Sequence, residues 1–309
     1  MKPIDKQFEK RAAFTIVELL TVMSIIVILI GLLVPALSSV KRFAKRVKQQ
    51  AQFYSIGAAL ELFSNEEEGY PDSGAHDEVG EEYCGAMRLC EAMVGQDLLG
   101  FHPSSHFRSD LTIAGTAETL LYDYDPDSQA DDPNEENLRS RKGPYLQLEN
   151  ANAYRLGHLF YSMGNFGADS ENLFVLCDVY SRVTNRVTGK KVGMPILYYK
   201  ANTSGIRHDP EHLPTLGDSE GNIYNYLDND ELVQLGMPWA PGLTHPICST
   251  GGTTSTGDPA DPRIFYEKTK NDDIAIEVGR PYRSDSYILL SAGFDGEYGT
   301  SDDIFNFGD

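Results

Sequence analysis

The chain has 309 residues, 41% of them hydrophobic, and a formal net charge of −20 at pH 7. Its size suits one large or two ordinary domains. Beyond residue 65 it carries 42 acidic against 17 basic residues. Such a surface repels nucleic acid, so we expect no nucleic-acid partner. The four cysteines are too few and too irregularly spaced for a disulfide scaffold or a zinc ribbon, and their pairing stays open.

The N-terminal segment is basic and then strongly apolar. Residues 19–40 contain no charged side chain and would reach about 33 Å as a helix, which matches a bilayer core. One acid, Glu18, lies at the beginning of this run. A carboxylate in a lipid-facing helix raises the free energy of membrane insertion by on the order of 2 to 3 kcal/mol. We therefore expect an acid at this place to have a partner that offsets this cost.

Two ordinary interpretations explain this segment incompletely. A cleaved secretory signal has an apolar region of about 7 to 15 residues, shorter than this one. A plain transmembrane anchor fits the length, but basic residues precede the span and also follow it in 41–48. The rule that basic residues flank the cytoplasmic end of a membrane span therefore predicts no orientation for this segment. A plain anchor also leaves Glu18 unexplained.

A third interpretation comes from residues 13–18, which read Ala-Phe-Thr-Ile-Val-Glu. After a short basic leader and before about 20 apolar residues with Pro35, they resemble the prepilin motif of type IV pilins and type II secretion pseudopilins. The resemblance implies that a prepilin peptidase cuts between Ala13 and Phe14 and that the new amine of Phe14 is methylated. It also implies that Glu18 is the retained acid of the mature helix. The family most often has glycine where this chain has Ala13.

This resemblance gives Glu18 a partner. Cleavage turns the amine of Phe14 into a cation at the end of an apolar helix, and a neighbouring copy's Glu18 can neutralise it. In the low-dielectric interior of a helical bundle, a paired carboxylate is tolerable and an unpaired one is costly. Phe14 and Glu18 are thus the expected assembly residues of a filament. Further implied partners are an inner-membrane assembly platform and minor pseudopilins.

The resemblance implies three parts: a cleaved leader (1–13), a helix (14–65) that is transmembrane over about 14–40, and an exported domain (66–309). The second half of the helix carries an apolar stripe at three- and four-residue steps, which predicts packing on the exported domain. Its members are Val40, Ala44, Val47, Ala51, Tyr54, Ala58 and Leu62.

The exported domain shows one further helix pattern and several strand patterns. Apolar spacing predicts a helix over 83–99, and β-branched and aromatic runs predict strands within 172–180, 195–201 and 286–293. Turn-rich sequences at 121–137 and 249–262 predict loops. We therefore expect an α+β fold in which a helical spine packs against an antiparallel sheet with long loop insertions. The resemblance implies the same pilin-like fold.

The C-terminal segment 291–309 is an acidic, glycine-rich loop with Asp295, Asp302 and Asp303. Carboxylates and backbone carbonyls are ligands that calcium takes, but a solvated acidic turn has the same composition. The resemblance implies a calcium site here, with these three aspartates as side-chain ligands. We then expect chelation to lower the melting temperature.

Other metal and catalytic patterns are weaker. The acids of 123–127 resemble the opening of an EF-hand but lack its glycine and its last glutamate, and Pro210 between His208 and His212 argues against a helical zinc pair. No nucleophile elbow or phosphate-binding loop is present in the sequence. We therefore expect a protein that is not an enzyme.

Taken with these patterns, the resemblance implies a structural subunit of a type II secretion pseudopilus or a type IV pilus-like filament that supports protein secretion. It would be a single-pass protein of the bacterial inner membrane with its C-terminal domain in the periplasm, and later part of a periplasmic or extracellular filament. One alternative is a minor pilin or adhesin at a filament tip with a ligand-binding outer domain. Another is a signal-anchored enzyme.

Overall fold

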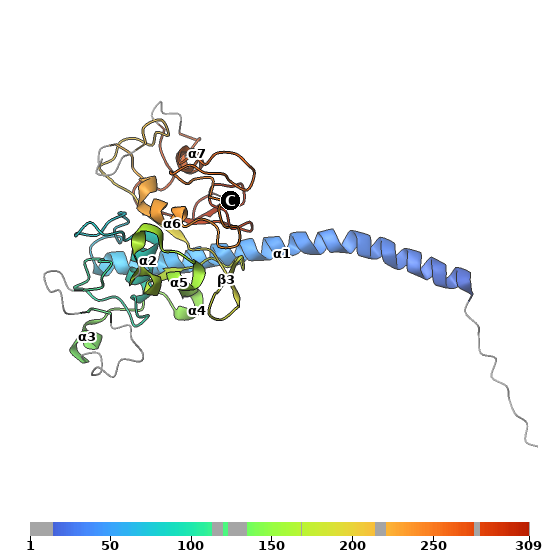
Figure 1. Ribbon diagram of the computed structural model, residues 1–309, viewed down its shortest axis with the longest axis horizontal. Coiled ribbons are helices and arrows are strands. Elements are labelled where there is room, and N and C mark those ends of the chain that lie inside the picture. Colours follow the sequence, from blue (N-terminus) through green and yellow to red (C-terminus); the bar gives the residue numbers. More distant parts are fainter. Residues whose placement is uncertain are drawn as a thin grey trace, which may run out of the picture. The chain divides into compact units, whose positions relative to one another are not determined.

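The computed structural model describes residues 15–112, 120–122, 135–167, 169–213, 221–274 and 279–308. The chain divides into an N-terminal unit, Met1–Lys45, and a C-terminal unit, Arg46–Asp309. The boundary falls inside helix α1 (Ile16–Glu66), which Figure 1 shows in blue. The expected leader, 1–13, lies outside the described residues.

The C-terminal unit combines short helices with small antiparallel sheets (Figure 1). Its helices are α2 (Gly85–Val94), α3 (Glu135–Ser140), α4 (Leu148–Ala151), α5 (Leu156–Leu159), α6 (Asp230–Gln234) and α7 (Arg263–Thr269), with 3-10 turns at Gly164–Phe166, Asp169–Asn172 and Tyr226–Asn229. Strands β5 (Leu197–Lys200), β6 (Tyr287–Ser291) and β7 (Ile304–Phe305) form a three-stranded sheet in that order. Two further antiparallel pairs join β1 (Ala153–Arg155) to β2 (Phe174–Leu176) and β3 (Val183–Thr184) to β4 (Lys191–Val192). The α+β class is confirmed.

Helix α1 confirms the long helix predicted from the apolar run. It continues through Pro35, which removes one backbone donor from the helical ladder. One turn later the Ser38 hydroxyl donates to the carbonyl oxygen of Val34 at 3.0 Å. The helix continues beyond Pro35 to Glu66, so this proline does not end it.

The face of α1 that is buried in the C-terminal unit differs from the predicted one. The predicted stripe is exposed: Val47 is 48%, Tyr54 80% and Leu62 54% accessible. The buried residues of α1 are Gln49, Gln52, Phe53, Ile56, Ala59, Leu60 and Phe63. At 3.6 residues per turn the two sets lie roughly 160° apart around the helix. The prediction was wrong because both faces of α1 carry apolar residues at helical spacing, and the buried face also contains two glutamines, which an apolar count leaves out.

These two glutamines hydrogen-bond to the backbone near strand β2. The Gln52 amide donates to the carbonyl oxygens of Cys177 at 2.9 Å and Asn150 at 3.3 Å. The Val179 amide donates to Gln49 Oε1 at 2.9 Å. These bonds satisfy Gln52 Nε2 and Gln49 Oε1, whereas Gln52 Oε1 and Gln49 Nε2 are buried without a partner among the described residues. An unpaired buried polar group costs about 1 to 3 kcal/mol, so each glutamine offsets only part of the cost of its burial. The bonds also fix the rotation of α1 about its axis.

The central sheet is buried on both sides. Alternate residues of a strand point to opposite faces, so Tyr198 and Leu289 join Ile56 and the other apolar residues of the buried face of α1 in one cluster. Their neighbours, Tyr199 among them, belong to a second cluster. Each large side chain buried in this way contributes about 1.5 to 3 kcal/mol. This explains why the strand sequences read as continuous apolar runs.

The predicted strands and the second predicted helix are confirmed with shorter bounds, whereas the predicted loop 121–137 lies outside the described residues over 123–134 and runs into α3 at Glu135. Strands β2, β5 and β6 fall within the three predicted runs. Helix α2 is shorter than the predicted 83–99 because Gly95 follows it at φ 76°, a conformation that ends helices, and its amide donates to the carbonyl oxygen of Glu91. All four cysteines are buried and free.

Candidate functional site

The start of α1 places Glu18 in a capping box with Thr15. The Thr15 backbone amide donates to Glu18 Oε2 at 2.9 Å, and the Thr15 hydroxyl donates to the same oxygen at 2.7 Å. The Glu18 amide donates in turn to Thr15 Oγ1 at 3.2 Å. Two helix-start amides are thereby satisfied reciprocally. The charge argument missed this local role, although the spacing Thr15-x-x-Glu18 is a known sequence signal for it.

The capping box itself supplies no cation to the negative charge of Glu18. Both bonds from Thr15 come from neutral groups, and no lysine, arginine or histidine among the described residues pairs with Glu18. The expected partner, the amine of Phe14, lies outside the described residues, as does Ala13 on the other side of the predicted cleavage point.

The helix that follows Glu18 is exposed and apolar. Ile16 is 82% and Leu32 71% accessible, and the other large apolar side chains up to Val40 are exposed as well. Within the described residues, one helix is long and apolar enough to cross a membrane, judged by length and composition alone. Such a segment is compatible with a membrane anchor or with a signal sequence.

The C-terminal loop is held closed by its own residues. Asp295 accepts from the Glu297 amide at 2.9 Å and from the Thr300 hydroxyl at 2.8 Å. The turn requires glycine at Gly293, whose φ is 66° and where a Cβ would lie 2.0 Å from the carbonyl oxygen of Asp302. The loop is therefore an ordered turn, in which both carboxylate oxygens of Asp295 accept hydrogen bonds.

Asp303, one of the three predicted calcium ligands, has a buried carboxylate. Its side chain is 1% accessible, and Oδ2 accepts from the Gly299 amide at 2.9 Å. Burial raises the pKa of Asp303 to about 7, although the nearby Lys268 ammonium opposes this shift. Its other oxygen, Oδ1, is buried without a hydrogen-bond partner. Such an oxygen is a potential ligand for a cation.

A lysine already occupies the space beside Asp303. The ammonium of Lys268 lies 3.3 Å from Asp303 Oδ2 and donates to the carbonyl oxygen of Thr300. In the described part of the chain, no group of three or more histidine, cysteine, aspartate or glutamate side chains is arranged to hold a metal ion. As they lie, the side chains of Asp295, Asp302 and Asp303 do not form such a group.

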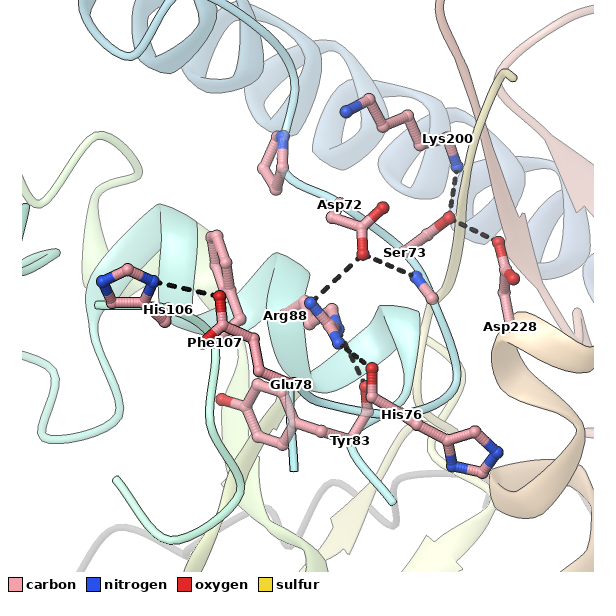
Figure 2. A network of polar contacts seen from close by, with 12 residues as sticks. Asp72, Ser73, His76, Glu78, Tyr83, Arg88, His106, Phe107, Lys200 and Asp228 are labelled. Carbon is pink, nitrogen blue, oxygen red and sulfur yellow. Dashed lines mark hydrogen bonds and ion pairs between the residues drawn. The ribbon is translucent and has the colours of Figure 1, made fainter. Parts of the chain in front are cut away.

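A second polar cluster lies where the chain leaves α1 (Figure 2). Arg88 of α2 contacts Asp72 at 3.2 Å and donates to the carbonyl oxygens of Tyr83 at 2.9 Å and His76 at 2.5 Å. Only 5% of the Arg88 side chain is accessible. Arg88 therefore ties residues 72–83 to α2, a contact that no local spacing predicts.

The same cluster buries Asp228 beside Ser73 (Figure 2). The Ser73 hydroxyl donates to Asp228 Oδ2 at 2.5 Å and accepts from the Lys200 amide at 2.9 Å. Burial raises the pKa of Asp228 to about 8, and the charge of Asp72 adds to this shift, whereas the Ser73 bond and Arg88 oppose it. A largely protonated Asp228 at neutral pH follows from this environment.

This environment predicts that Asp228 makes stability depend on pH. The unfolded carboxyl titrates near 3.8 and the folded one near 8, so between these values the folded state binds more protons. Stability therefore falls as pH rises through this window, by up to about 1.4 kcal/mol for each pH unit from this group. Asp228→Asn, which keeps an acceptor for Ser73, should show a flatter profile in denaturant titrations across this range.

The control for this prediction is Glu211→Gln, since Glu211 is 78% accessible. It should follow the wild-type profile. Equal pH slopes for Asp228→Asn and the wild-type protein would show that Asp228 is ionised in the folded state.

The remaining candidate metal residues are placed differently. His208 is buried, and its Nε2 lies 2.8 Å from the Thr269 hydroxyl and 3.1 Å from the carbonyl oxygen of Tyr266. Its ring is therefore part of the core that packs against α7. His212 lies elsewhere, with its carbonyl oxygen bonded to Asn222. The EF-hand-like acids of 123–127 lie outside the described residues.

Comparisons with protein-family models, with curated proteins and with solved structures found no match to this chain.

Proposed function

We propose that this chain is a structural subunit of a type II secretion pseudopilus or a type IV pilus-like filament. In this proposal a prepilin peptidase removes residues 1–13, the apolar part of α1 anchors the chain in the inner membrane, and the C-terminal unit faces the periplasm. The processed chain then packs with further copies of itself, on an inner-membrane assembly platform and together with minor pseudopilins.

The observation that carries the proposal is the single charge of Glu18 at the start of an exposed apolar helix. A capping box needs only an acceptor, and glutamine serves as well as glutamate. A glutamate in that position adds a negative charge that is costly in lipid. A cation supplied by another copy, the processed amine of Phe14, would offset this cost.

The exposed stripe of α1 supports a second copy of the chain as partner. Val47, Ala51, Tyr54, Ala58 and Leu62 follow one another at steps of three or four residues and are all exposed. This spacing is that of a helix seam that packs on another helix. In the proposed filament, the stripe extends the contact between neighbouring copies beyond the membrane.

The mature N-terminus tests this proposal. Mass spectrometry of the chain isolated from membranes should find it beginning at Phe14 with a methylated amine. The Glu18→Gln variant is the matched control and should be processed to the same extent. An intact Met1 would favour a plain anchor, and a cut after the apolar run would indicate a secretory signal; either result contradicts the proposal.

A subunit at a filament tip, with a ligand-binding outer domain, is the second candidate. The observation in its favour is a surface pocket of about 450 Å³ lined by Asp72, Lys200 and Asp228 among other polar residues, a volume in the usual range of ligand sites. Immunogold labelling of fibres separates the two candidates, because a major subunit repeats along the fibre and a tip subunit appears once.

A further inference from the structure

Lys268, which lies beside the C-terminal loop, belongs to helix α7, and buried side chains hold this helix in place. Helix α7 buries Phe265, Tyr266 and Thr269, and the Phe265 ring lies 4.5 Å from that of Tyr199 on the central sheet. His208 contacts Thr269 from outside the helix. The backbone of Lys268 is therefore held in place, and its side chain, 26% accessible, extends from there to the loop.

The contacts of Lys268 are those that a bound cation would make. Its ammonium faces one buried carboxylate oxygen, Asp303 Oδ2, and one backbone carbonyl, that of Thr300. Carboxylate and carbonyl oxygens are also the ligands of calcium in proteins. The remaining oxygen, Asp303 Oδ1, is buried and unpartnered, as expected where one ammonium substitutes for an ion that takes more ligands.

We propose that Lys268 is the resident cation of the C-terminal loop, and that its ammonium takes the place that calcium would occupy beside Asp303 and Thr300. The loop then closes without metal, and this proposal replaces the expectation from the resemblance that calcium binds here and that chelation lowers the melting temperature. A divalent cation can enter only if Lys268 leaves, because two cations in one small buried site repel each other. This inference concerns the C-terminal unit alone and does not depend on filament assembly.

Thermal unfolding of the full-length protein in detergent tests the proposal, in millimolar calcium chloride and in chelator. The wild-type protein should melt at the same temperature in both. Lys268→Met keeps the apolar stem but removes the charge, so this variant should melt several degrees lower in chelator and regain part of that loss with calcium. Lys270→Met, which removes an exposed lysine at the end of the same helix, should behave like the wild-type protein.

Three results would overturn the proposal: a wild-type melting temperature that falls on chelation, a Lys268→Met variant that matches Lys270→Met in both solutions, or a destabilised Lys268→Met variant that calcium does not rescue. The wild-type comparison stands even if Lys268→Met fails to fold. For that case the double variant Lys268→Met/Asp303→Asn removes both charges, and it should fold and show no calcium response. A calcium response of this double variant would also contradict the proposal.

Discussion

Replacing Glu18 with glutamine should leave the chain processed and inserted in the membrane but reduce its filament yield by about tenfold or more. Glutamine still accepts from Thr15, so the capping box at the start of α1 is kept. The variant loses the negative charge that pairs with the Phe14 amine of a neighbouring copy. That amine is then an unpaired cation in a low-dielectric bundle, which costs several kcal/mol. The measurement is the amount of fibre sheared from cells, compared with the amount of chain in their membranes.

Thr15→Ala is the matched control, because it weakens the cap and keeps the charge. Loss of an N-cap hydroxyl costs about 1 kcal/mol at the helix start, so fibre yield should stay near the wild-type level. If Glu18→Gln assembles normally while Thr15→Ala does not, Glu18 acts through capping alone. The charge would then have no part in assembly.

The second large effect is expected at Ile56, on the buried face of α1. Ile56→Ala should lower the free energy of unfolding of the C-terminal unit by about 2 to 5 kcal/mol, because Ile56 is 0% accessible and its removal leaves a cavity in the core. Denaturant unfolding of the full-length protein in detergent, followed by tyrosine fluorescence, measures this loss.

Leu62→Ala removes a side chain of similar size from the exposed stripe. Because Leu62 is 54% accessible, its stability effect should stay within about 0.5 kcal/mol, while the fibre yield should fall. Equal destabilisation by Leu62→Ala and Ile56→Ala would mean that the stripe packs inside the C-terminal unit, as the sequence pattern suggested.

The long helix and the main strands could be predicted because their signals are local. Residues 19–40 form an uncharged, mainly apolar run, and β5 and β6 are short apolar runs bounded by turn residues. The capping box of Thr15 and Glu18 also has a local signal, which the argument from charge alone overlooked. Spacing within the sequence suffices for such features.

The packing face of α1 and the surroundings of the loop could not be predicted in this way. Gln52 is buried because Cys177, 125 positions away, offers its carbonyl oxygen, and Ser73 meets Asp228 across 155 positions. Lys268 reaches the Thr300 carbonyl across 32 positions through a helix that the sequence analysis did not predict. These contacts depend on tertiary structure, which residue spacing does not reveal.

The most direct test of the assembly role is the structure of purified fibres at the start of α1. The amino nitrogen of Phe14 in one copy should lie within ion-pair distance, about 4 Å, of the Glu18 carboxylate of the adjacent copy. Fibres in which this nitrogen and this carboxylate are well separated, with Glu18 bonded only to Thr15 of its own chain, would contradict the account.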